Sequence, residues 1–231
     1  MLIFASTKAI VIMDSLKTLI EDFSLTAEER KRILKDLDHS MPDSFKRIAE
    51  SVLSGCFVVS SEGKDDVRIY PTVVEFYYHE EGDGGIKDPI VYHRNTLSSE
   101  KNVIPIGIFH NHVSGVDITF ERNIGRIVRA SVLIRAFSIE GGLNKASMDA
   151  FSIPLTNNEH STHIYAALFS QFSMFDGFTI KWEDGKEPAK IKEGERTNVY
   201  RYNIETNKKG QPIYVKTDIK CPRLWQAIKL Q

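Results

Sequence analysis

The stretch VVEFYYHEEGDGGIKDPIVYHRN, residues 73–95, contains the strongest indications of both fold and chemistry. It begins inside a run rich in β-branched and aromatic residues, Val67–His79, which predicts a β-strand. Alternate side chains of a strand share a face, so Glu75 and Tyr77 point the same way, about 7 Å apart. Burial raises the pKa of a carboxyl group, and a half-buried Glu75 beside an aromatic ring is therefore suited to general-base chemistry.

Upstream of this strand the sequence predicts two helices and a hairpin. Thr26 and Glu29 form a capping-box pattern that opens a helix over Glu28–Leu37, with Ile33 and Leu37 on one face. A second helix follows Asp43, with Phe45, Ile48, Val52 and Leu53 as its apolar side and Gly55 at its end. CFVVSS, residues 56–61, then predicts a strand joined to the next one by the Ser61–Lys64 turn, and Pro71 indicates an edge or a bulge.

Downstream of the glycine-rich loop Gly82–Asp88, short strands predominate. We expect strands over Val91–His93, Val103–His112, Val116–Phe120 and Ser131–Ile139, and a late helix with Ile164, Leu168 and Phe172 on one face. Residues 182–231 indicate loops and short strands, with a terminal helix around Leu224–Leu230. Helices followed by an antiparallel sheet and one later helix predict an α+β fold.

Length and composition favour one globular domain. The chain has 231 residues and a net charge of −1, and residues 181–231 carry 12 basic against 7 acidic side chains. We expect residues 1–25 to form an N-terminal arm, with Met13 as an alternative start, and residues 26–231 to form the domain. Cys56 and Cys221 cannot make a disulfide framework and lack metal-site spacing, and no segment has membrane-spanning length. These features predict a cytoplasmic monomer without membrane contact, metal or cofactor.

Four short motifs follow one another between residues 44 and 140. The helix ends in Ser51–Gly55, Val73–Tyr77 reads VVEFY, the acidic loop leads to Asp88 and His93, and Val132–Ala136 reads VLIRA. In this order the motifs resemble the methylpurine-DNA glycosylases, which have a Leu-Leu-Gly-like helix end, a Val-Glu-x-Glu-Ala-Tyr strand, an Asp/His loop and a Val-Leu-Leu-Arg-Ala strand. The resemblance implies a single α+β domain with a curved, mostly antiparallel sheet flanked by helices.

The resemblance also implies a reaction. Such enzymes repair DNA by flipping an alkylated or deaminated purine out of the duplex and hydrolysing its glycosidic bond through an oxocarbenium-like transition state. Glu75 would activate the attacking water, and Arg135 would orient Glu75 or hold a phosphate. Tyr77 and His93 would stack on the flipped base, and damaged double-stranded DNA would be the partner.

The segment IFHNHVSGVD, residues 108–117, occupies the place of the tyrosine-rich hairpin that walls the base pocket in this family. Phe109, His110 and His112 would line that pocket or wedge into the duplex, and Asp117 would discriminate purine edges. His110-x-His112 also has the spacing of half a zinc site, but only one residue separates His112 from Ser114, which does not fit the deubiquitinase-type metalloprotease motif.

Two departures from the family pattern leave other functions open. The family's Gly-Pro-Gly-like loop is replaced by IPLTNN at residues 153–158, and the chain is not basic overall. Both weaken the expectation of duplex binding more than that of the pocket. One alternative is an N-glycoside hydrolase acting on a small nucleoside or nucleotide, and the other is a non-catalytic ligand-binding protein on the same fold.

Overall fold

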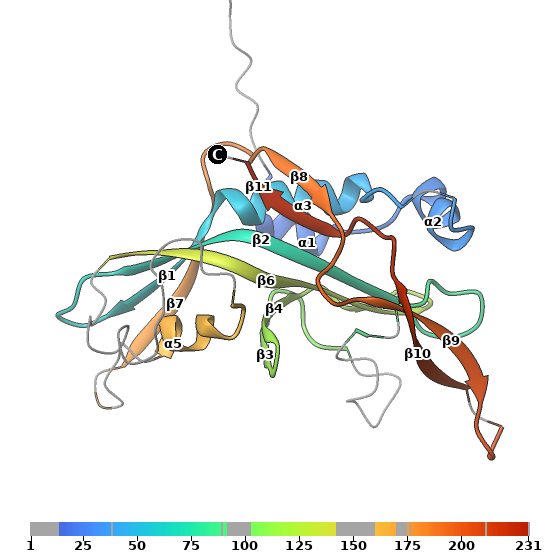
Figure 1. Ribbon diagram of the computed structural model, residues 1–231. Helices are drawn as coiled ribbons and strands as arrows, with labels where there is room; N and C mark the ends of the chain where they lie inside the picture. Colours follow the sequence, from blue (N-terminus) through green and yellow to red (C-terminus); the bar gives the residue numbers. More distant parts are fainter. Residues whose placement is uncertain are drawn as a thin grey trace, which may run out of the picture.

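The computed structural model describes residues 14–37, 39–88, 90–91, 103–141, 160–169, 175, 177–210 and 212–230. These residues form an α+β fold in which one long, curled sheet has helices α1, α2 and α3 on one side and helix α5 on the other (Figure 1). All strand pairings among the described residues are antiparallel. The predicted α+β class with a curved antiparallel sheet is therefore confirmed.

The three N-terminal helices are α1 (Leu16–Glu21), α2 (Ala27–Leu34) and α3 (Asp43–Ser54). The predicted capping box is present at the start of α2: the Thr26 side chain accepts from the backbone of Glu29, whose side chain accepts from the backbone of Thr26. The expected extension to Leu37 is wrong, because α2 ends at Leu34 and Leu37 is 72% exposed. Helix α1, which the sequence did not indicate, adds Leu16 and Ile20 to the core, so packing begins ahead of residue 26.

Two long neighbouring strands form the centre of the sheet, β2 (Val67–Glu80) and β6 (Ile127–Gly141). Strand β1 (Cys56–Ser61) pairs with the start of β2, as the predicted hairpin requires. The register between β2 and β6 shifts between Pro71 and Val74, which confirms the irregularity expected at the proline. The order across the sheet is β3-β4-β6-β2-β1-β7.

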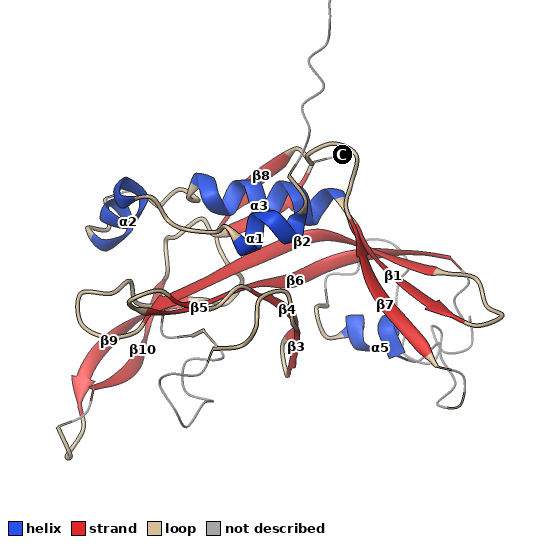
Figure 2. Cartoon of the chain, turned by 180° about the vertical axis from the view of Figure 1, so that it is seen from behind, coloured by secondary structure: helices blue, strands red, loops and turns tan. Residues whose placement is uncertain are grey.

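The remaining strands are shorter. They are β3 (Phe109–His112), β4 (Gly115–Thr119), β5 (Arg122–Asn123), β7 (Phe178–Glu183), β8 (Ile191–Gly194) and β11 (Gln226–Lys229) in the main sheet, and β9 (Tyr200–Thr206) and β10 (Pro212–Lys220) in a separate two-stranded ribbon. Helix α5 spans His163–Phe169, where a late helix was expected, and Phe172 lies outside the described residues. Figure 2 shows the ribbon running away from the body of the molecule.

Two further expectations about secondary structure are wrong. The strand predicted over Val103–His112 is a strand only from Phe109, because residues 103–108 are irregular and turn at Ile106 and Gly107. The terminal helix predicted around Leu224–Leu230 is strand β11, which pairs with β2 on one side and with β8 on the other. The hydrogen bonds gained by pairing with the exposed edge of the long strand β2 outweigh the helix preference of this short terminal segment.

The two faces of the sheet differ in chemistry. On the face covered by the helices, Phe76 of β2 stacks on Phe45 of α3 with ring centroids 4.6 Å apart, and Val74 and Tyr78 join the same buried cluster. On the opposite face, the residues between them, Glu75 and Tyr77, are polar. The hydrophobic core therefore lies between the sheet and the helices, and the polar residues of β2 lie on the opposite face.

The edge of β2 beyond β11 is covered by side chains and loops. The backbone N–H of Phe76 donates to the carbonyl of Trp225, and its carbonyl accepts from Arg196. The N–H of Tyr78 donates to the carboxylate of Asp88, which forms a buried ion pair of 2.6 Å with Arg196.

No described helix is long and apolar enough to cross a membrane. Both cysteines are free thiols.

Candidate functional site

A row of directly paired residues crosses the polar face of the sheet. His110 on β3 pairs with Asp117 on β4, Asp117 with Leu133 on β6, Leu133 with Glu75 on β2, and Glu75 with Gln226 on β11. Directly opposite residues on neighbouring strands point to the same face. At about 4.8 Å per strand, His110 and Glu75 lie about 14 Å apart along this row. The sheet thus places residues from five strands on one surface.

Glu75 is the centre of the polar contacts on this surface. It is only 1% exposed, and its carboxylate accepts three hydrogen bonds. Its Oε1 atom accepts from the backbone N–H of Thr197 at 2.7 Å and from Nε2 of Gln226 at 2.9 Å, and Oε2 accepts from the Tyr77 hydroxyl at 2.7 Å. A carboxylate has about four acceptor positions, so one on Oε2 is left for a further donor.

The predicted neighbour Tyr77 contacts Glu75 through its hydroxyl. Burial, together with the adjacent charge of Glu75, raises the pKa of Tyr77 well above its ordinary value, so the hydroxyl keeps its proton and donates it to Glu75. The guanidinium of Arg196 lies 5.0 Å from the centre of the Tyr77 ring. The guanidinium therefore covers one face of the ring.

Arg135 joins Glu75 from the neighbouring strand β6. Its Nε lies 3.8 Å from Oε1 of Glu75, and its side chain is 28% exposed. Its Nη1 donates to the Ser161 hydroxyl just before α5 at 3.1 Å, and Ser161 in turn donates to the carbonyl of Ser114. Arg135 thus connects the buried carboxylate with the molecular surface and with the β3–β4 hairpin.

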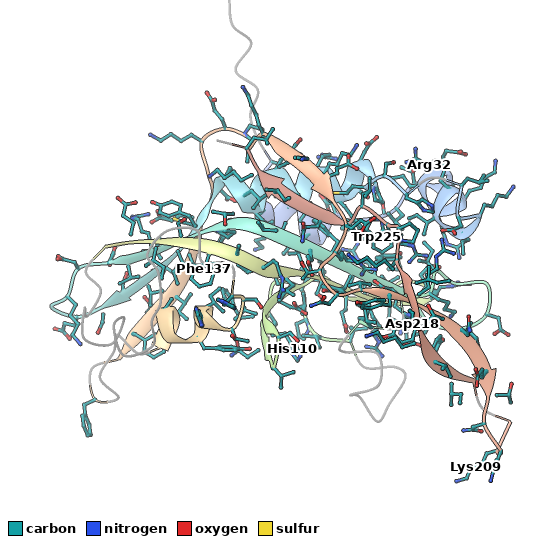
Figure 3. The ribbon with its side chains drawn as sticks, viewed as in Figure 1. Arg32, His110, Phe137, Lys209, Asp218 and Trp225 are labelled. Atoms are coloured by element: carbon teal, nitrogen blue, oxygen red, sulfur yellow. The ribbon has the colours of Figure 1, made fainter. Side chains whose placement is uncertain are left out.

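Asp117 and His110 extend the site away from Glu75. Asp117 is 3% exposed and accepts a hydrogen bond of 3.0 Å from the Ser131 hydroxyl on β6. His110 is half-buried beside Asp117 in the β3–β4 pair, and Figure 3 shows it on β3, below the long strands β2 and β6. Both residues are on the same face as Glu75, as the implied base pocket requires.

The structure does not bring all predicted site residues together. Phe109 faces the helix side, where its ring packs edge-on against Phe57 at 4.7 Å and lines an apolar cavity with Leu16 and Ile20. It is separated from Glu75 because neighbouring residues of a strand point to opposite faces. His93 lies outside the described residues, and of His112 only the backbone is described.

Comparisons with known proteins leave the resemblance untested. No protein-family model and no curated protein matches this chain. The family relationship therefore stays a hypothesis that rests on the order of the motifs.

Sequence reasoning missed three residues of the site. Thr197, Gln226 and Arg196 contact Glu75 or Tyr77, yet they lie about 120 to 150 positions further along the chain. No local pattern marks them, because each owes its position to β11, which pairs with the edge of β2, or to β8, which pairs with β11. Among the residues that the structure describes, no cluster of three or more His, Cys, Asp or Glu side chains is arranged to hold a metal ion.

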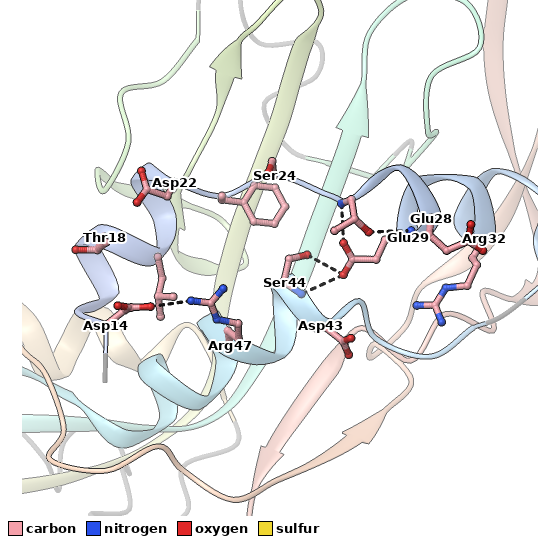
Figure 4. Close-up of a pocket in the computed structure, with 13 residues that line it drawn as sticks. Asp14, Thr18, Asp22, Ser24, Glu28, Glu29, Arg32, Asp43, Ser44 and Arg47 are labelled. Atoms are coloured by element: carbon pink, nitrogen blue, oxygen red, sulfur yellow. Dashed lines mark hydrogen bonds and ion pairs between the residues drawn. The ribbon is translucent and has the colours of Figure 1, made fainter. Parts of the chain in front are cut away.

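A separate cavity of about 510 Å³ lies between the three N-terminal helices (Figure 4). Its polar side chains form hydrogen bonds and ion pairs at the ends of these helices. Glu29 accepts from the backbone of Thr26 and Ser44, and Arg47 forms an ion pair of 2.7 Å with Asp14. Burial alone would raise the pKa of Glu29, but these backbone donors outweigh it and hold that pKa below its ordinary value. We assign this cavity no chemistry.

Proposed function

We propose that this protein is an N-glycoside hydrolase that removes a damaged purine from DNA, with Glu75 as the general base. The observation that carries the proposal is the arrangement of Glu75, Tyr77 and Arg135. All three lie on the polar face, where Tyr77 donates a hydrogen bond to Glu75 and Arg135 lies within ion-pair distance of it. The motif order that suggested the family gives Glu75 and Arg135 catalytic roles and gives Tyr77 a place beside the flipped base.

The reaction uses the remaining acceptor position of Glu75. A water molecule there transfers a proton to Oε2 as its oxygen forms a bond to the anomeric carbon of the deoxyribose. The bond from that carbon to the purine nitrogen breaks, and its electron pair leaves with the base. A cationic alkylpurine leaves as a neutral base and therefore needs little help from an acid.

The other contacts orient the base for this step. Thr197 and Gln226 fix Oε1, and Tyr77 fixes the direction of Oε2, so the carboxylate has one orientation. Arg135 is partly exposed beside the buried carboxylate, and we place the approach of the sugar there. Asp117 and His110 lie further along the same row, where they would contact the edge of the flipped purine.

Glu75→Gln is the variant that tests the proposal. A glutamine keeps an oxygen for Thr197 and Gln226, and its amide group can donate to the Tyr77 hydroxyl, but it cannot take up a proton from water. We expect base release from duplexes carrying 3-methyladenine, ethenoadenine or hypoxanthine to fall at least 100-fold, with an unchanged urea midpoint. No release by the wild-type protein from any of these duplexes would refute the proposal.

A second candidate is a non-catalytic role. The three donors around Glu75 come from β2, β11 and the segment after β8, so the same carboxylate also ties these elements together. In a protein that only binds its ligand, Glu75→Gln would leave both folding and ligand affinity nearly unchanged. Base release that is present and depends on Glu75 excludes this alternative.

A further inference from the structure

The β9–β10 ribbon has the features of an interaction element. Its two strands pair with each other and with no other described strand. An isolated two-stranded ribbon is only marginally stable in water. Ile204 and Ile219 are more than 60% exposed on it, and Figure 3 places Lys209 at the far tip, well away from the body of the molecule. Such a projecting element is best explained by a partner that it contacts.

The charge of the ribbon identifies the kind of partner. Residues 200–220 contain five basic side chains and two acidic ones, although the whole chain has a net charge of −1. Lys208 and Lys209 lie side by side in the turn at the tip, and both are exposed. A basic arm on a slightly acidic protein is complementary to a polyanion.

A cavity of about 240 Å³ lies at the base of the ribbon, between β9, β10 and the end of α2. Three tyrosines and three cationic residues line it: Tyr200, Tyr202, Tyr214, Lys87, Arg201 and Arg223. Its two acidic residues already have partners. Asp36 pairs with Arg201 at 3.1 Å, and Asp88 pairs with Arg196 at 2.6 Å. The lining therefore has a surplus of positive charge.

Arg223 carries much of this surplus. Its guanidinium donates one hydrogen bond, to the carbonyl of Lys87 at 3.1 Å, and lies 4.7 Å from the centre of the Trp225 ring. Among the described residues it has no carboxylate within ion-pair distance. Burial lowers the pKa of Arg223 from its ordinary value, which reflects a desolvation cost that the nearby charge of Asp88 offsets only in part. An anionic group in the cavity would offset that cost, and phosphate suits the fork of donors on a guanidinium.

We propose that the β9–β10 ribbon and the cavity at its base bind the phosphate backbone of duplex DNA. The inference deepens the proposed function, on which it rests, by naming the surface that holds the DNA. A two-stranded ribbon fits the width of the major groove, where its lysines lie near the phosphates. Lys216 lies 4.0 Å above the Tyr200 ring and covers one face of it, which leaves less ring surface for stacked single-stranded bases and favours contact with a phosphate backbone.

The test is the affinity of the full chain for an undamaged, labelled 25-base-pair duplex, measured by fluorescence anisotropy across a salt series. The first variant is Lys208→Gln/Lys209→Gln, which changes only exposed tip residues, and the second is Arg223→Gln. The matched control is Lys17→Gln/Lys181→Gln, which removes two exposed charges on α1 and β7. A single strand of the same sequence is measured alongside.

We expect the tip variant to weaken duplex binding on the order of tenfold and to reduce the slope of log Kd against log salt by about 2. The control should bind like the wild type. Arg223→Gln should also weaken binding, and its urea midpoint should show that the variant protein is folded. A tip variant with wild-type affinity, or tighter binding of the single strand than of the duplex, overturns the inference.

The same assays separate this inference from the proposed function. If the duplex binds through the tip but no base is released, the ribbon surface stands and the glycosylase proposal fails. If base release depends on Glu75 but the tip variant keeps the wild-type Kd and salt slope, the glycosylase proposal stands and the ribbon surface fails.

Discussion

At the scale of single residues, the buried pair of Asp88 and Arg196 is the contact on which the site depends most. Arg196 is only 4% exposed, lies over the rings of Tyr77 and Trp225, and precedes Thr197, whose backbone donates to Glu75. Asp88 is the carboxylate that neutralises it. An unpaired buried charge is far more costly than the loss of an exposed one.

We therefore predict that Asp88→Asn lowers the free energy of unfolding by about 3–5 kcal/mol. Asparagine is nearly isosteric and still accepts from the N–H of Tyr78, so the change isolates the charge on the carboxylate. Urea denaturation measures the loss. Asp14→Asn, which breaks the exposed pair with Arg47, should cost less than about 1 kcal/mol. Equal costs for the two variants would contradict the prediction.

The same residues show how far the sequence could predict the site. Glu75 and Tyr77 follow from the period-2 pattern of one strand, and Arg135 follows from a motif on the adjacent strand. Thr197, Gln226 and Arg196 could not be predicted, because their contacts depend on strands that return to β2 from the end of the chain. Phe109 was assigned to the pocket from its neighbours in sequence, although strand alternation sends its side chain to the other face.

At the scale of elements, Gly55 shows a correct prediction with a different cause. The sequence predicts that this glycine ends the second helix, as glycines with a left-handed backbone do, and α3 does end there. Its φ angle is −90°, however, so any residue could adopt the conformation. A glycine is required here because strand β7 lies close by: an added Cβ would lie 2.4 Å from the Trp182 ring and 2.5 Å from the carbonyl of Glu183.

We predict that Gly55→Ala destabilises the protein by about 1–3 kcal/mol, since the helix end and strand β7 must separate to admit one methyl group. Thermal unfolding followed by circular dichroism measures the change. Gly177→Ala, just before β7, provides the matched control, because nothing lies within 4 Å of its added Cβ. A Gly55→Ala protein as stable as the Gly177→Ala protein would show that β7 does not pack as described.

At the scale of the whole molecule, hydrogen bonds and ion pairs to buried carboxylates hold the N-terminal helices on the sheet, in addition to the hydrophobic core. Glu80 at the end of β2 is 3% exposed and accepts from Arg30 of α2, from Arg126 before β6 and from the backbone of Ile86. Burial alone would raise the pKa of Glu80, but the hydrogen bonds from Arg30 and Ile86 outweigh it and lower the pKa below its ordinary value of 4.5.

The direction of that pKa change fixes how stability should depend on pH. Because the folded pKa lies below the unfolded one, the unfolded chain binds more protons between the two values, and stability falls as the pH falls through that range. The contribution of Glu80 is fully present at pH 6–7 and is lost progressively below about pH 4.5. Glu29 acts in the same direction at the start of α2. We therefore expect acid to loosen α2 from the sheet.

Urea denaturation of the wild type, Glu80→Gln and Glu62→Gln between pH 3 and pH 7 tests this expectation. At pH 7, Glu80→Gln should lower the free energy of unfolding by about 2 kcal/mol, since it removes charge-assisted hydrogen bonds. The gap to the wild type should close as the pH approaches 3, because the wild-type carboxylate is then protonated as well. Glu62 lies in the exposed Ser61–Lys64 turn, and its replacement should leave the wild-type pH curve unchanged. A gap that stays constant from pH 7 to pH 3 would mean that packing, and not the charge of Glu80, holds α2 in place.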